Sequence, residues 1–182
     1  MIEICQNVIV GLRTVTVHIR DLMSGDEAAL RRVLRNVAIF EPYEIEVAED
    51  LIAEALTGSG EYLIHVASGE GTPDARVVGY VCHGHNPVTD AVYDLYWIAV
   101  DPSVHGRGIG RQLMAYTEDR VRGLHGRGIV IETSDRPAYE PAKRLYEKCG
   151  YEKVAEIPDF YKPGDGQLVY AKFFSGTHRR TT

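Results

Sequence analysis

The feature that most constrains the fold is a glycine-rich turn between a strand-like run and a helix-like run. The apolar run from Ala91 to Val100 leads into Gly106, Gly108 and Gly110, and an amphipathic segment covers Ile109 to Leu124. Glycines let a ligand approach the backbone closely, and the first-turn N–H groups of a helix favour an anion such as phosphate. The chain is therefore expected to contain a strand–loop–helix unit that binds a phosphate-bearing ligand.

The spacing of the glycines separates this loop from two other phosphate-binding loops. The glycines read G-x-G-x-G rather than the G-x-G-x-x-G of a Rossmann fingerprint, whose third glycine would fall at Arg111, and no Gly-Lys-Ser/Thr of a P-loop follows. The loop instead resembles the pyrophosphate loop of the GCN5-related N-acetyltransferases (GNAT), whose signature is Gln or Arg, two residues, Gly, one residue, then Gly or Ala. His105 stands where that family has Gln or Arg. The resemblance implies that the following residues bind the coenzyme: His105, Gly106, Arg107, Gly108, Ile109, Gly110 and Arg111.

Length and composition indicate a globular chain with one domain. The 182 residues are 45% hydrophobic and 25% charged, which is typical of a protein with a substantial core. We expect a single domain over 14–174, an N-terminal extension over 1–13 and a flexible tail over 175–182.

Charge and cysteine usage restrict the partners and the compartment. The net charge of −6 argues against nucleic acid as the main partner. No apolar run approaches the roughly 20 residues that cross a bilayer, and Met1 to Leu12 lacks the basic start of a signal peptide. The scattered Cys5, Cys82 and Cys149 suggest free thiols. A cytoplasmic protein, monomeric or homodimeric and without a membrane partner, is expected.

The hydrophobic pattern predicts an alternation of strands and helices. Ser24 is the expected N-cap of the first helix, and Glu41-Pro42 is expected to break it. The expected strands cover 14–19, 61–67, 76–83, 91–100, 128–132, 151–157 and 167–174, and the expected helices cover 25–37, 47–56, 109–124 and 141–149. The strand at 128–132 lies between two helices, which favours a locally parallel position.

The element order predicts the fold class. We expect an α/β (α+β) fold whose mixed central sheet has about six to seven strands, flanked by about four helices. This order is similar to that of the acyl-CoA N-acyltransferase fold of the GNAT family, and the resemblance covers roughly 15–174.

A second stretch, Ala142 to Tyr151, also resembles a family motif, written A-x-x-L-Y-E-K-x-G-F. Independently of the family, Ala142, Leu145, Tyr146 and Cys149 fall on one helix face that can pack on a sheet. Tyr146 could therefore be a core aromatic residue. The combination of this stretch with the glycine loop favours Tyr146 as a residue that faces the thioester of acetyl-CoA.

The resemblance implies direct acetyl transfer from acetyl-CoA to a primary amine of a small molecule, such as an amino acid, or of a protein or peptide. Ile98 and Ala99 would pair with the pantetheine arm, and the N–H of Val100 would face the thioester carbonyl. Tyr146 would protonate the departing thiolate. Glu132 is a candidate base at the carboxyl end of its strand, although it could equally form a salt bridge there; Asp94 or a water chain are the alternatives.

Three aromatic residues, Tyr43, Trp97 and Tyr161, are candidates for the acceptor groove. In the family, the region of the second helix lies over that groove, and the turn at Asp159 to Asp165 faces it. The second-helix region is strongly acidic, which is typical of a solvated face and could also attract a cationic amine.

Other functions are weighed on specific features. Cys82-His83-Gly84-His85 has no second cluster to complete a tetrahedral metal site, and alternation places Cys82 opposite the histidines, so no metal is expected. Cys149 is interpreted as a buried small hydrophobic residue. The alternatives to an enzyme are a non-catalytic acyl-CoA-binding or regulatory module on the same fold, and a nucleotide-binding protein of another kind.

Overall fold

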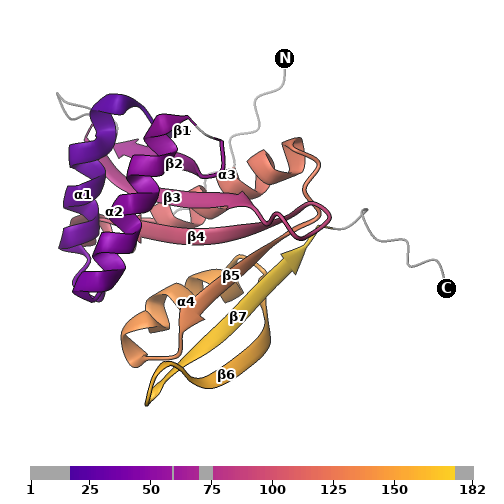
Figure 1. Cartoon of the computed structure of the whole chain (residues 1–182). Coiled ribbons are helices and arrows are strands. Elements are labelled where there is room, and N and C mark those ends of the chain that lie inside the picture. Colours follow the sequence, from indigo (N-terminus) through magenta and orange to yellow (C-terminus); the bar gives the residue numbers. More distant parts are fainter. Residues whose placement is uncertain (1–16, 59, 70–75, 175–182) are drawn as a thin grey trace, which may run out of the picture.

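The computed structural model describes residues 17–58, 60–69 and 76–174, and Figure 1 shows their arrangement. The α-helices are α1 (Glu27–Asn36), α2 (Pro42–Thr57), α3 (Ile109–Gly123) and α4 (Glu140–Lys148), and the short 3-10 helices are η1 (Ser24–Asp26), η2 (Pro102–Val104) and η3 (Pro137–Tyr139). The strands are β1 (Val17–Asp21), β2 (Leu63–Gly69), β3 (Val77–His85), β4 (Val92–Val100), β5 (Gly128–Ser134), β6 (Glu152–Lys162) and β7 (Asp165–Phe173).

The seven strands form one mixed sheet in the order β1-β2-β3-β4-β5-β7-β6. Neighbouring strands are antiparallel except β4 and β5, which run parallel. The predicted fold class is confirmed, and so is the locally parallel position of the strand that begins at Gly128. The parallel pair follows from the α3 crossover, because a parallel connection needs a long return path whereas a hairpin does not.

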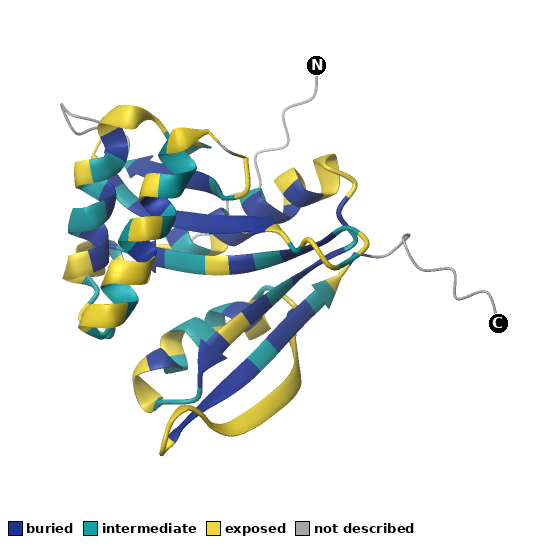
Figure 2. Ribbon diagram, viewed as in Figure 1, coloured by how far each residue is buried: buried dark blue, intermediate teal, exposed yellow. Residues whose placement is uncertain are grey.

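Helices cover both faces of the sheet, and each face has its own core. α1 and α2 pack through Leu30, Val33 and Ile52 against one face. α3 and α4 pack through residues such as Leu113 and Tyr146 against the other face. Figure 2 shows buried residues along the central strands and exposed residues along the whole of β6. The predicted apolar face of the fourth helix is confirmed, since Ala142, Leu145, Tyr146 and Cys149 all belong to or pack against this second core.

Two helix starts differ from the prediction. Ser24 does not cap the first α-helix; it begins η1, and Asp26 precedes α1. The carboxylate of Asp26 accepts hydrogen bonds from the Arg20 guanidinium at 2.6 and 2.8 Å and from the Met23 N–H at 2.9 Å, which stabilises that extra turn. α2 begins at Pro42, five residues before the predicted start, because proline fits the first helical turn.

The last hairpin is also tighter than predicted. β6 continues to Lys162, so the expected turn from Asp159 to Asp165 is reduced to the two residues between β6 and β7. Ile157 pairs with Gln167 and Lys162 with Asp165, so the intervening residues of β6 bulge away from the ladder. Asp159 has a positive φ of 54° in this bulge, and its carboxylate accepts the Gly164 N–H at 2.6 Å.

Some predicted features lie outside the described residues. These are Cys5, the extension over 1–13, the start of the first strand at 14–16, most of the predicted turn at 69–74, and the tail over 175–182. Within the described part of the chain, no helix is both long enough and apolar enough to span a bilayer.

Candidate active site

The site forms where the two parallel strands at the centre of the sheet separate. β4 pairs with β5 only from Val92 to Leu95, against Gly128 to Ile131, and the two strands diverge beyond that point (Figure 1). The register of β4 against β3 also shifts between Trp97 and Leu95, so Tyr96 is the extra residue of a β-bulge. A cleft with a volume of about 420 Å³ lies at this divergence.

The cleft receives side chains from both layers of helices. Tyr43, Glu44 and Val47 of α2 line it from one face of the sheet, and Ala142 and Tyr146 of α4 line it from the other. The open gap between β4 and β5 therefore connects the two faces at this point. Two ligands could approach the same point from opposite faces, which is what a transfer between them requires.

The diverging end of β4 turns backbone groups toward the gap that no neighbouring strand pairs. The Asp101 N–H donates to the Val78 carbonyl at 2.8 Å, so the polar groups of Asp101 point toward β3. Because these directions alternate along a strand, Ala99 also turns its N–H and C=O toward β3, whereas Ile98 and Val100 turn theirs toward the gap. Of the three residues predicted to contact the pantetheine and thioester, Ile98 and Val100 present backbone groups to the gap, and Ala99 is buried.

The glycine loop follows directly and opens toward solvent. Gly106 and Gly108 have φ of 75° and 80°, a left-handed conformation that favours glycine, and a Cβ at either position would contact nothing within 4 Å. Gly108 is the N-cap of α3. The first-turn N–H groups of α3 thus lie beside open space, as an anion site requires. Arg107 and Arg111 are exposed, and neither forms an ion pair with another described residue.

Gly110 serves packing rather than ligand access. A Cβ at this position would lie 3.0 Å from Cδ2 of Leu145. The absence of a side chain lets the start of α3 approach α4, which carries Tyr146. The two sequence motifs are therefore in contact, although 35 positions separate Gly110 from Leu145.

His105 and Asp101 hold the loop in place. Nε2 of His105 lies 2.7 Å from the carbonyl oxygen of Val100, so this nitrogen carries the proton and donates it. Asp101 accepts the N–H and hydroxyl of Ser103 at 3.0 and 2.6 Å and the amide of Asn36 at 3.1 Å. Burial raises the pKa of Asp101, but these hydrogen bonds and the charge of Arg76 lower it by more. The net pKa lies below the usual value, so the carboxylate stays ionised.

Tyr146 is buried, with 5% of its surface exposed, yet it lines the cleft. Its ring packs 5.6 Å from that of Tyr170, measured between centroids. Burial, with a smaller contribution from Tyr170, raises the pKa of the Tyr146 phenol well above its usual value. The hydroxyl is thus protonated at neutral pH and can donate a proton.

Glu132 of β5 lies on the opposite side of the divergence from β4. Its carboxylate accepts a hydrogen bond from Nε2 of Gln167 at 2.8 Å, and it forms no ion pair with the described residues. Gln167 also hydrogen bonds to Tyr161, which partly offsets the effect of burial in raising the pKa of that phenol. The predicted Glu132 and Tyr161 are therefore linked through a buried glutamine that the sequence interpretation did not identify.

Asp94, the alternative base, faces the same cleft from β4. Its carboxylate accepts the side-chain amide of Asn86 at 2.9 Å. Burial raises the pKa of Asp94, and the hydrogen bond from Asn86 and the charge of His85 offset only part of this effect. A carboxylate with a raised pKa is a stronger base than an ordinary one.

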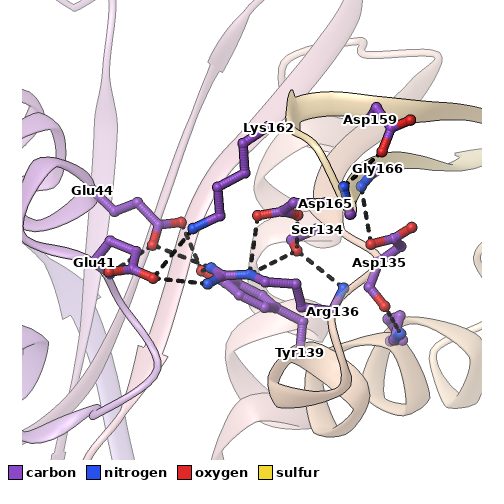
Figure 3. A network of polar contacts seen from close by, with 12 residues as sticks. Glu41, Glu44, Ser134, Asp135, Arg136, Tyr139, Asp159, Lys162, Asp165 and Gly166 are labelled. Atoms are coloured by element: carbon purple, nitrogen blue, oxygen red, sulfur yellow. Dashed lines mark hydrogen bonds and ion pairs between the residues drawn. The ribbon is translucent and has the colours of Figure 1, made fainter.

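Arg136 connects the walls of the cleft at its far end (Figure 3). Its guanidinium lies 3.0 Å from Glu41 and 3.6 Å from Glu44, and its Nε lies 3.1 Å from Asp165 of β7. Glu44 also accepts the hydroxyl of Tyr139 at 2.6 Å. We call Glu41, Glu44, Arg136, Tyr139, Lys162 and Asp165 the Arg136 network. It joins α2 to the β5 end and to the β6–β7 hairpin.

Aromatic rings form much of the remaining wall. The rings of Phe40 and Trp97 lie 4.9 Å apart, and Phe40 lies 6.4 Å from Tyr139. Tyr43 and Tyr161 line the cleft and are 52% and 43% exposed, so they lie at its mouth. The structure thus brings the three predicted acceptor residues, Tyr43, Trp97 and Tyr161, to one cleft with Glu132 and Tyr146.

Several residues of the site were missed by the sequence interpretation. Asn86 and Gln167 were not identified, although a polar residue in the apolar run of β7 is a usable signal. Arg136 and Tyr139 gave no signal, because their partners Glu41 and Glu44 at the start of α2 are 95 positions distant. The described residues contain no group of three or more His, Cys, Asp or Glu that could hold a metal ion.

The comparisons with known proteins agree with this geometry. A family model described as an acetyltransferase (GNAT) domain matches residues 60–153. A structure from Desulfovibrio desulfuricans, assigned to the GNAT acetyltransferases, is 35% identical with a TM-score of 0.80, over 87% of this chain and 99% of that one. Arabidopsis thaliana NAA60, solved in complex with acetyl-CoA, has a TM-score of 0.71 over 88% of this chain and 100% of its own, and at 18% identity it shows the fold alone.

Curated relatives match only part of their own length. A mycothiol acetyltransferase of Thermomonospora curvata is 34% identical over 84 residues, which are 45% of this chain and 26% of that protein. The chain spans about a quarter of the length of the first curated relatives it matches, at 27%, 26% and 24%. The likeness therefore covers only a part of those proteins.

Proposed function

Because the chain belongs to the GNAT acetyltransferase family, we propose that it transfers the acetyl group of acetyl-CoA directly to a primary amine. The observation that carries this proposal is the divergence of β4 and β5 beyond Leu95 and Ile131, next to the glycine loop. It leaves strand-edge groups for the pantetheine, helix-end amides for the pyrophosphate, and a cleft for the amine.

The coenzyme is proposed to bind along the loop and the free edge of β4. The N–H groups at the start of α3, with Arg107 and Arg111, would hold the pyrophosphate. Ile98 and Val100 would pair with the pantetheine arm as an added strand would. The N–H of Val100 would then stabilise the oxyanion that forms when the amine attacks.

The transfer needs two proton movements. The amine nitrogen attacks the carbonyl carbon of the thioester, the C–S bond breaks, the amine gives up one proton, and the coenzyme A thiolate gains one. Tyr146 is proposed as the acid, because it lines the cleft and its hydroxyl holds a proton at neutral pH that the departing thiolate can accept. Glu132 is proposed as the base, with Asp94 as the competing one; Asn86 and Gln167 keep the two carboxylates oriented.

A thiol-release assay with acetyl-CoA and a panel of amines tests the proposal. The expected result is release of coenzyme A that depends on the amine. Binding of acetyl-CoA without turnover on any amine would instead favour a non-catalytic acyl-CoA-binding module. A cytoplasmic location remains part of the proposal, and the free thiols of Cys82 and Cys149 support it.

Gly108→Asp tests the coenzyme site itself. Aspartate tolerates the left-handed conformation of this position, so the fold should survive, but its carboxylate would repel the phosphates. We expect calorimetry to show loss of acetyl-CoA binding. Gly108→Asn is the matched control, because it has the same size and conformational tolerance without the charge, and it should bind more tightly than the aspartate variant. Equal affinity of the two variants would contradict an anion site at the start of α3.

A further inference from the structure

The charges around the cleft restrict which amines it can accept. Four carboxylates line the cleft, Glu44, Asp94, Glu132 and Asp165, and no Lys, Arg or His is among the described residues that line it. A cleft of this composition repels an anionic substituent and attracts a cationic one. The question is how much of this negative charge the neighbouring residues already neutralise.

The Arg136 network neutralises the far end only in part. Arg136 pairs with Glu41, Glu44 and Asp165, and Lys162 lies 3.5 Å from Glu41. The three carboxylates of Glu41, Glu44 and Asp165 are thus paired with only two cations, Arg136 and Lys162. This group therefore keeps a net charge of −1. The guanidinium of Arg136 is fully engaged by these partners, so it is not available to bind a carboxylate of the acceptor.

Asp94 and Glu132 form no ion pair with a Lys or Arg among the described residues, and the one titratable cation that acts on Asp94 is His85, which lies outside the cleft lining. Their side chains are held by the neutral amides of Asn86 and Gln167. Asp94 is paired in register with Val130, and Glu132 lies two positions further along β5. Side chains two positions apart share a face, so both carboxylates point to the face covered by α2. Burial raises the pKa of Asp94, and the hydrogen bond from Asn86 and the charge of His85 do not fully offset it.

Aromatic rings line the same cleft as these two carboxylates. Phe40, Trp97 and Tyr139 form a contiguous group with centroid distances of 4.9 and 6.4 Å. The faces of such rings attract ammonium groups, and their surfaces cover methylene chains. The combination of rings and unneutralised carboxylates is therefore suited to a cation on an apolar chain.

We infer that the acceptor is a carboxylate-free amine with a second cationic group, such as an alkyl diamine, rather than a free amino acid. This inference rests on the proposed function. One carboxylate receives the proton of the reacting amine while the other binds the second ammonium group. A carboxylate on the acceptor would meet uncompensated negative charge and would find no cation in the described lining.

Three matched substrates test the inference: 1-aminopentane, 1,5-diaminopentane and lysine. The second differs from the first by one terminal amine, and lysine differs from the second by one carboxylate. We expect kcat/KM to be at least tenfold higher for diaminopentane than for aminopentane, and lower for lysine than for either. Equal rates on lysine and diaminopentane, or a preference for lysine, would overturn the inference.

Asp94→Asn tests the residues involved. The readout is the ratio of kcat/KM for diaminopentane to that for aminopentane, because any loss of a base affects both substrates and cancels in the ratio. The ratio should fall toward one in this variant. Asp119→Asn makes the same charge change on α3, where the side chain is 80% exposed and outside the cleft, and should keep the wild-type ratio. An unchanged ratio in Asp94→Asn would overturn the role of Asp94.

The outcomes separate this inference from the proposed function. Acetylation of a peptide amine but of none of the three substrates would overturn the inference and leave acetyl transfer intact. Failure to acetylate any amine, with acetyl-CoA bound, would contradict the proposed function itself.

Discussion

A buried pair of histidines gives the protein a specific dependence of stability on pH. Nδ1 of His65 lies 2.9 Å from the Asp21 carboxylate, and its Nε2 lies 3.0 Å from Nε2 of His83. A carboxylate only accepts, so His65 donates from Nδ1 and, when neutral, accepts from Nε2–H of His83. His65 and His83 are 2% and 0% exposed, and Nδ1 of His83 has no partner among the described residues.

Burial is the main reason that the folded state keeps this pair neutral. Burial, with smaller contributions from the charges of His65 and Arg120, lowers the pKa of His83 to about 3. Burial also lowers the pKa of His65, against the opposing effect of Asp21. The pKa of histidine in an unfolded chain is about 6.5. The unfolded chain therefore takes up protons below that pH, whereas the folded chain does not. The stabilisation is therefore present above about pH 6.5 and is lost as the pH falls toward 3.

The expected magnitude follows from these two values. Between about pH 7.5 and pH 5, His83 alone should remove about 2 kcal/mol of unfolding free energy. Urea unfolding of the wild type and of His83→Leu at both pH values measures it: the variant should lose about 2 kcal/mol less over this interval, with a residual slope from His65. His18→Gln, at an exposed position, should follow the wild type. An equal pH dependence of the wild type and His83→Leu would refute the reasoning.

Three further predictions concern the site. Tyr146→Phe should lower kcat by ~10²–10⁴-fold with little change in acetyl-CoA affinity, whereas Tyr170→Phe, which alters the neighbouring ring, should keep most of the activity; wild-type turnover of Tyr146→Phe would remove it from the mechanism. His105→Arg should keep or strengthen acetyl-CoA binding at low salt, because a guanidinium binds phosphate oxygens in pairs, and a large loss in calorimetry would show that the bond to Val100 matters more. Arg136→Met should lower the unfolding free energy by about 3 kcal/mol, because Asp165 is left buried without its cation, whereas Lys162→Met should cost less than about 1 kcal/mol; equal losses in urea unfolding would contradict a central role of Arg136.

Local patterns were sufficient to predict the order of the elements and the position of the loop. The apolar run from Ala91 to Val100, the glycines after it and the apolar face of the fourth helix are all set by residues close together in the chain. Helix starts were less predictable. Arg20, on the preceding strand β1, binds the carboxylate of Asp26, and Pro42 was interpreted as a break rather than as a first-turn residue.

The cleft itself depends on long-range pairing that no local pattern specifies. The divergence of β4 and β5 depends on where their pairing stops, and the bulge at Tyr96 depends on the register against β3. The partners of Glu132 and Arg136 lie 35 and 95 positions from them, so their roles emerged only from the folded chain. The sequence could indicate which residue types the site contains, but not which carboxylates would remain without a cation.

The measurement that tests the central claim most directly is the balance between coenzyme A released and acetylated amine formed, followed by mass spectrometry with acetyl-CoA and 1,5-diaminopentane. Direct transfer to an amine predicts one acetylated amine for each coenzyme A, with both products lost in Gly108→Asp. Release of coenzyme A without any acetylated amine would show hydrolysis of the thioester, and would contradict the assignment of this cleft as an amine acetyltransferase site.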